Sequence, residues 1–157
     1  MKLSIEDLTN VARGAALLGT GGGGDPYIGR MLATSAIKEF GMPKIIDASE
    51  LKDTDMVFTI AMLGAPTVLS EKGACGDDID LAIKRMEKYL GRKADALMPI
   101  EIGGVNSMLP IVAAARLNLP LVNVDGMGRA FPEIQMVTFN VYGVPCTPAC
   151  VTDEHLN

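Results

Sequence analysis

The chain has 157 residues, 48% of them hydrophobic, which is enough for one domain with a buried core. Its net charge of −5 argues against a nucleic-acid partner, because phosphate binding needs clustered basic side chains, and favours a small polar ligand instead. No apolar stretch reaches the roughly 18 residues of a membrane span, and charges at Lys2, Glu6 and Asp7 interrupt any amino-terminal apolar run. We therefore expect a cytoplasmic protein without a membrane partner.

Two helices are predicted at the start of the chain. Ser4 followed by Asp7 is typical of a helix N-terminus, and apolar residues at helical spacing extend this first helix over 5–18. The glycines that follow end it, since they lose too much backbone entropy in a helix. Asp25 as the cap and Pro26 in the first turn then predict a second helix over 26–40.

The sequence GTGGGGDP between these helices, residues 19–26, is a candidate binding loop. A flexible loop that opens into a helix can offer several N–H groups to an anion or a carbonyl oxygen. It lacks the Gly-Lys-Ser/Thr ending of a P-loop and follows a helix, so it matches no common nucleotide motif. We interpret it as a ligand-contacting or closely packed loop, with a plain hinge as the alternative. The candidate substrate-binding residues are Gly21, Gly22, Gly23, Gly24 and Asp25.

The middle of the chain predicts two strands and a helix. Residues 44–48 and 55–63 have strand composition, and 49–51 forms a turn or short helix between them. The segment 64–67 would then reach the carboxyl end of the second strand. Residues 77–90 predict an amphipathic helix whose charged face is ordinary solvation rather than a phosphate site.

The stretch 96–132 predicts the centre of the fold. It reads as a strand over 96–102, a glycine turn, a helix over 107–118 and a strand over 119–124. The connection is too long for a hairpin and suits a βαβ crossover, so both strands should run parallel. We therefore predict an α/β fold, a layered domain with a mostly parallel sheet flanked by helices, Rossmann-like in outline.

This topology predicts a cleft with two acidic side chains. Glu101 ends the first strand and Asp125 follows the second, so both should face one crevice outside the carboxyl ends of the strands. The helix that begins near Asn106 should point unpaired N–H groups into that space. Arg129 would neutralise a carboxylate or hold an anionic group. Four glycines would permit close approach of a ligand or another backbone, namely Gly103, Gly104, Gly126 and Gly128.

The alternative for this region assigns no function to it: the glycines make tight turns, Glu101 is solvated and Arg129 forms a surface ion pair. After it, alternation over 136–142 predicts a strand, and the proline-containing tail 144–157 lies outside the α/β domain 1–143. Three cysteines are too few for a disulfide framework, and a metal stays open. The single histidine, His155, lies in the tail, so general acid–base chemistry would fall to carboxylates.

Several long motifs of the chain resemble one known family. These are GTGGGGDPYIG at 19–29, GAPTVLSEK at 64–72, PIEIGGVNSMLP at 99–110 and LPLVNVDGMGRAFPEIQMVTF at 119–139. They are similar to the amino-terminal domain of the S-methyl thiohydantoin desulfurase family, which is linked with hydantoin utilisation. Family members carry a further β-rich carboxyl-terminal domain, so the resemblance implies that the tail leads to a domain absent from this chain.

The resemblance implies a hydrolase-like enzyme that acts on five-membered hydantoin-type rings. Water would attack the ring carbon that bears sulfur, with Glu101 or Asp125 as general base and Arg129 with glycine-loop N–H groups stabilising negative charge. Asn106, which has both a donor and an acceptor, would bind a ring amide. The alternative is a non-catalytic metabolite-binding or subunit-assembly module. In either case an uncovered apolar surface would favour a homo-oligomer.

Overall fold

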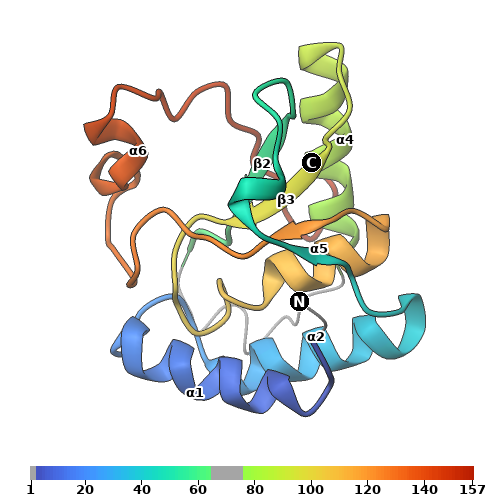
Figure 1. Cartoon of the computed structure of the whole chain (residues 1–157), viewed down its shortest axis with the longest axis vertical. Coiled ribbons are helices and arrows are strands. Elements are labelled where there is room, and N and C mark those ends of the chain that lie inside the picture. The colour runs from blue at the N-terminus through green and yellow to red at the C-terminus, as the bar shows by residue number, and fades with distance from the viewer. Residues whose placement is uncertain (1–2, 65–75) are drawn as a thin grey trace.

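A parallel β-sheet forms the centre of the chain in the computed structural model, which describes residues 3–64 and 76–157 (Figure 1). Its strands are β1 (Ile45–Ile46), β2 (Val57–Ile60), β3 (Ala96–Pro99) and β4 (Leu121–Val122), in the order β1-β4-β3-β2. Every residue of β3 is buried, as its unbroken apolar run predicted, because β3 pairs on both sides. The predicted α/β fold with a parallel sheet is therefore confirmed.

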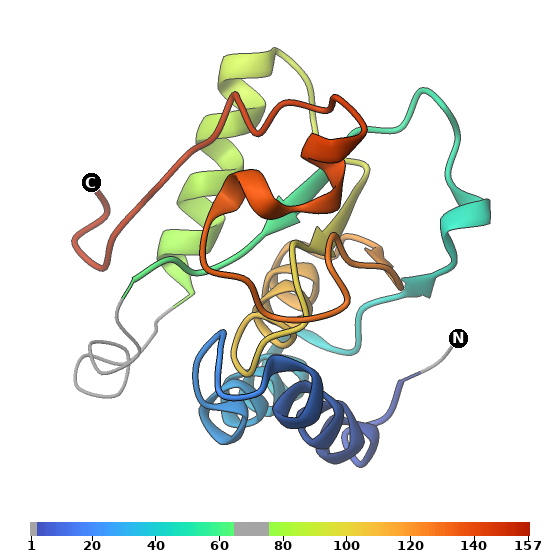
Figure 2. The same cartoon turned by 90° about the vertical axis from the view of Figure 1, so that its left-hand side faces the viewer.

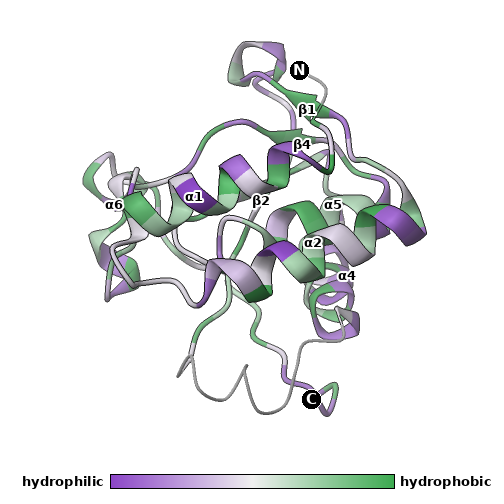
Figure 3. Cartoon of the chain, turned by 90° about the horizontal axis from the view of Figure 1, so that it is seen from below, coloured by the Kyte–Doolittle hydropathy of each residue, from purple (hydrophilic) through white to green (hydrophobic). Residues whose placement is uncertain are grey.

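One face of the sheet carries most of the core. Helix α5 (Leu109–Leu117) packs on β3, α2 (Pro26–Phe40) packs on α5, and α1 (Asp7–Gly19) packs on α2. Figure 2 shows these helices stacked below the sheet, and Figure 3 shows the mixed hydropathy along α1 and α2. Helix α4 (Asp77–Leu90) adds Ile83 to the same core.

The other face of the sheet has a thinner cover. Four buried side chains, those of Ile46, Ala96, Met98 and Val122, are covered by Leu51, Val57 and Phe139. Phe139 belongs to the short helix α6 (Thr138–Val141), and Leu51 follows the 3-10 helix η1 (Ala48–Glu50). This face therefore depends on short irregular segments rather than on a long helix.

The predicted strand over 136–142 is wrong. The structure has a 3-10 helix, η2 (Ile134–Met136), followed by α6. The N–H and hydroxyl of Thr138 both donate to the carbonyl of Gly126, and the N–H of Tyr142 donates back to Thr138. These bonds leave no strand ladder, and Val141 is 78% exposed, so the alternating pattern did not correspond to one buried face.

The predicted start of α2 is confirmed, whereas α1 begins two residues later than predicted, at Asp7, and its N-cap residue Glu6 makes no side-chain cap bond. The hydroxyl of Ser4 donates to the carboxylate of Asp7 at 2.7 Å, and the N–H of Asp7 donates back to that hydroxyl. The carboxylate of Asp25 accepts the N–H of Tyr27 at 2.8 Å and so caps α2. The strands are shorter than predicted. Residues 65–67, which belong to the segment expected after the second strand, and residues 68–75 lie outside the described residues.

The carboxyl-terminal tail packs back on the domain. It runs from α6 toward α4 in both Figure 1 and Figure 2. The hydroxyl of Thr152 donates to the carbonyl of Asp78 at 2.8 Å, and the guanidinium of Arg85 donates to the carbonyl of Leu156 at 3.4 Å. The tail is therefore one wall of the structure beside α4, whichever segment would follow it in a longer protein.

The glycine loop between α1 and α2 contacts the segment after β3 through its backbone. The carbonyl of Gly22 accepts the N–H of Gly104 at 3.1 Å. The carbonyl of Gly23 accepts the N–H groups of Val105, at 2.6 Å, and Asn106, at 3.2 Å. A Cβ on Gly104 would lie 1.8 Å from the carbonyl oxygen of Gly24. Glycine at position 104 is therefore required for the two backbones to approach.

We expect Gly104→Ala to destabilise the fold by at least about 3 kcal/mol, because the added methyl group overlaps a backbone carbonyl that cannot move independently. Gly14→Ala is the matched control: Gly14 lies inside α1, and a Cβ there meets nothing within 4 Å. That variant should gain up to about 1 kcal/mol through helix propensity. Denaturant unfolding of both variants measures the contrast, and equal stabilities would contradict the packing.

The junction of α4 and β3 is held by one carboxylate. Glu87 accepts from the ammonium of Lys93 at 2.7 Å and from the N–H of Ala94 at 3.0 Å. Burial of the side chain opposes its ionisation, but these hydrogen bonds outweigh burial and hold the pKa of Glu87 below its ordinary value. The ionised form is therefore stabilised by folding.

Glu87→Gln should lower the free energy of unfolding at pH 7 and lose this effect in acid. Because the folded pKa lies below that of the unfolded chain, about 4.3, the contribution is complete above that pH and disappears as the pH falls through the folded pKa. Urea unfolding from pH 7 to pH 3 should show the parent and the variant converging. Glu39→Gln, at an exposed position, serves as the control. If the free energies of unfolding of the parent and Glu87→Gln differ by a constant amount across that pH range, the assignment is refuted.

Candidate functional site

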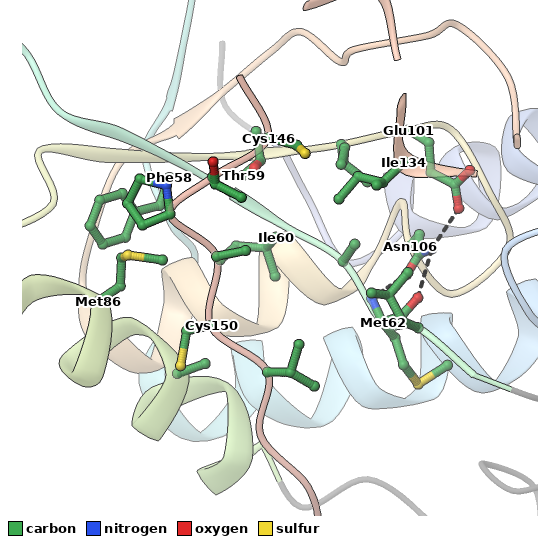
Figure 4. A pocket seen from close by; sticks show the side chains of 18 of the residues that line it. Phe58, Thr59, Ile60, Met62, Met86, Glu101, Asn106, Ile134, Cys146 and Cys150 are labelled. Carbon is green, nitrogen blue, oxygen red and sulfur yellow. Dashed lines mark hydrogen bonds between the residues drawn. The ribbon is translucent and has the colours of Figure 1, made fainter. Parts of the chain in front are cut away.

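A cavity of about 620 Å³ lies along β2, the edge strand of the sheet (Figure 4). Its walls come from β2 and the residues after it, from α4, from the loop 131–134 and from the tail 145–151. Glu101 and Asn106 lie at one end of the cavity in Figure 4. The cavity therefore reaches the carboxyl end of β3, where the sequence predicted a cleft.

The carboxylate of Glu101 is fixed at this end by two donors. Its side chain is only 5% exposed, and its Oε1 accepts the side-chain amide of Asn106 at 2.5 Å. Its Oε2 accepts the N–H of Phe131 at 3.0 Å. Each carboxylate oxygen has further lone pairs for a water or a ligand. Glu101 is thus a buried, oriented acceptor at a cavity wall.

Asn106 joins the loops that follow β2 and β3. Besides donating to Glu101, its side chain accepts the N–H of Met62 at 2.8 Å and donates to the carbonyl of Met62 at 3.3 Å. Figure 4 shows these bonds between Asn106, Glu101 and Met62. The side-chain amide therefore holds two loops of the chain together, while its predicted bond to a ring amide stays a prediction.

The other two candidate catalytic residues lie apart from the cavity lining. Asp125 follows β4 as predicted, but its carboxylate accepts the N–H groups of Met127, at 2.8 Å, and Gly128 within its own turn. Arg129 is exposed, and its guanidinium donates to the carbonyl of Ala130 at 2.8 Å. Of the three residues, Glu101 is the one that lines the cavity within the described part of the chain.

The glycine candidates divide between lining and packing. Gly23 and Gly24 line the cavity, while Gly103 and Gly104 are buried against the glycine loop. A Cβ on Gly126 would lie 2.7 Å from the carbonyl of Ile100, so this glycine also permits close packing. The remaining candidates are absent from the cavity lining found in residues 3–64 and 76–157, namely Gly21, Gly22 and Asp25.

The helix N-terminus near Asn106 does not offer the free donors that the sequence suggested. The N–H groups of Gly104, Val105 and Asn106 donate to the carbonyls of Gly22 and Gly23 instead. Conversely, within the described chain the N–H groups of Gly23 and Gly24 have no hydrogen-bond acceptor. If backbone donors act on a ligand here, they are those of the glycine loop.

No sequence pattern indicated the apolar and sulfur-containing walls of the cavity. Phe58 and Ile60 from β2 and Met86 from α4 line it, together with Cys146 and Cys150 from the tail (Figure 4). Both cysteines are free thiols. No local pattern could show that the tail returns to β2, because that contact depends on tertiary structure. Across the described residues no group of three His, Cys, Asp or Glu side chains is placed to hold a metal.

The comparisons with known proteins agree with this fold. Residues 6–157 match the family model described as S-Me-THD-like, N-terminal domain. The X-ray structure of a protein from Chromobacterium violaceum is 32% identical, with a TM-score of 0.78 over 94% of this chain. The match covers 41% of that protein, so this chain spans less than half of its length.

Two further searches were negative. No curated protein matches the chain, and no described helix combines the length and apolar character needed to cross a bilayer. The family match covers almost every residue, including the glycine loop, Glu101 and Asn106. The chain therefore belongs to the S-Me-THD-like N-terminal domain family.

Proposed function

We propose that the chain is the amino-terminal domain of a hydrolase-like desulfurase that acts on S-methyl thiohydantoin or a related hydantoin-type ring. The family gives the class of ring, and one structural observation supports the chemistry: the buried carboxylate of Glu101 lies at a cavity wall with both oxygens oriented by donors. In this proposal Glu101 is the general base.

The reaction replaces a carbon–sulfur bond by a carbon–oxygen bond. Water adds to the ring carbon that bears the S-methyl group, its proton passes to Glu101, and the electron pair of the ring C=N bond moves to nitrogen. The tetrahedral adduct collapses when the electron pair on the ring nitrogen re-forms the C=N bond and the C–S bond breaks. The departing methanethiolate takes the proton from Glu101, which regenerates the carboxylate. The hydroxyl proton then passes to the ring nitrogen, which leaves a carbonyl group on the ring.

The glycine loop fits the role of an electrostatic partner. Negative charge develops on the ring nitrogen as water adds. The N–H groups of Gly23 and Gly24, which line the same cavity as Glu101, have no acceptor among the described residues. Such donors stabilise a developing charge without reorganisation. Arg129 is exposed and contacts its own loop, so it would contribute only if that loop moves.

The choice of Glu101 over Asp125 rests on their hydrogen bonds. The carboxylate of Asp125 caps its own turn through the N–H groups of Met127 and Gly128, whereas Glu101 lines the cavity. We assign Asp125 to holding the loop after β4. Both residues nevertheless follow neighbouring parallel strands, β3 and β4.

We also propose a cytoplasmic homo-oligomer. Side chains on and after α6 are apolar and exposed: Val141 is 78% exposed, Tyr142 85% and Val144 52%. Contiguous apolar surface of this kind favours assembly. The same surface supports the alternative function, a non-catalytic metabolite-binding or subunit-assembly module.

Glu101→Gln should lower desulfurisation of an S-methyl thiohydantoin by about 10²–10⁴-fold, because the amide keeps the shape of the carboxylate but cannot accept a proton. Asp125→Asn should retain most of the turnover, since an amide oxygen still accepts the turn N–H groups. Release of methanethiol measures the rate, and circular dichroism checks that both variants fold.

Three outcomes would change the proposal. Normal turnover in folded Glu101→Gln would remove this residue as the base, and loss in Asp125→Asn alone would transfer the role. Binding of the ring by the unmodified chain without turnover would favour the non-catalytic module.

A further inference from the structure

The cavity has two chemically different ends. Glu101, Asn106 and the glycine loop form a polar end, while Phe58, Met86 and Cys150 lie at the opposite end in Figure 4. Ile60 lies between them on β2. Ile83 and Leu90 of α4, the helix that carries Met86, also line the cavity. We call the region between β2, α4 and the tail 145–151 the apolar compartment.

The cavity is larger than a bare five-membered ring requires. At about 620 Å³ it falls in the middle of the range of about 300–1,000 Å³ that is typical of sites for drug-sized ligands. A hydantoin-type ring at Glu101 would leave the apolar compartment empty. Most of the side chains that line it are apolar, so an apolar group of the ligand is the favoured occupant.

The charges around the cavity restrict what this group can be. Among the described lining residues the charged ones are Glu101 and Glu133, and the tail segment 145–151 carries no charge. A charged substituent in the apolar compartment would lose its hydration without gaining an ionic partner. An aliphatic or aromatic substituent would lose no such interaction and would bury apolar surface.

We infer that the site selects rings with a bulky apolar substituent, of leucine or phenylalanine side-chain size, that binds between β2, α4 and the tail. This inference rests on the proposed function for the ring and on the cavity for the substituent. Ala82 of α4 lines the compartment and is a specificity-determining position, because a larger side chain there would occupy the space of the substituent.

Binding of two ligands tests the inference. 5-Benzylhydantoin should bind the 157-residue chain about 10- to 100-fold more tightly than hydantoin, which corresponds to burial of one aromatic side chain. Ala82→Leu should abolish most of this gain. Lys88→Leu, which adds the same side chain at an exposed position of α4, should leave the gain intact. Isothermal titration calorimetry measures the affinities, and turnover of the matching S-methyl thiohydantoins is assayed in parallel.

The outcomes separate the inference from the proposed function. Equal affinity for the two rings, or a gain that persists in Ala82→Leu, overturns the inference even if rings are desulfurised. If Ala82→Leu removes the gain in affinity and neither S-methyl thiohydantoin is turned over, the compartment is supported and the desulfurase is overturned. If neither ring binds, the binding of toluene is measured instead. Toluene binding that is weakened by Ala82→Leu but not by Lys88→Leu supports the compartment, and any other result overturns it.

Discussion

The contact between the glycine loop and the segment after β3 is the constraint on which the rest of the structure depends. Carbonyl groups of Gly22 and Gly23 accept the N–H groups of residues 104–106, which form the turn that leads into α5. The contact is possible because Gly23, Gly103 and Gly104 leave no Cβ between the two backbones. It attaches the pair α1 and α2 to the carboxyl edge of the sheet.

The polar end of the cavity is built on that contact. Once residues 103–106 are fixed, Asn106 is placed to reach back to Glu101 and across to Met62, which ties the loops after β2 and β3 together. The carboxylate of Glu101 is then buried without an ionic partner among the described residues but with two hydrogen-bond donors. A buried carboxylate in this arrangement is rigid, because moving it would leave both donors unpaired.

The sequence predicted which acidic residues lie at the carboxyl edge of the sheet, but not which of them lines the cavity. Glu101 and Asp125 do follow parallel neighbouring strands, as apolar runs separated by a crossover helix indicate. Yet a strand end does not fix where a carboxylate points. Asp125 has N–H groups two and three residues ahead of it and bonds them, whereas Glu101 is followed by Ile102 and Gly103 and turns toward Asn106. The strand predicted over 136–142 failed for a related reason, because Thr138 bonds the distant Gly126.

By itself the sequence determined the order of the described helices and strands as far as β4, the parallel sheet, the capped start of α2 and the position of Glu101 at a strand end. These features follow from local periodicity, capping side chains and connection length, which act over a few residues. Tertiary structure alone decided that the glycine loop faces the backbone at 103–106, that Asn106 bonds Met62 and that the tail forms a wall of the cavity. Each of those contacts joins segments more than 40 residues apart, and backbone and side-chain packing, rather than any local pattern, selects them.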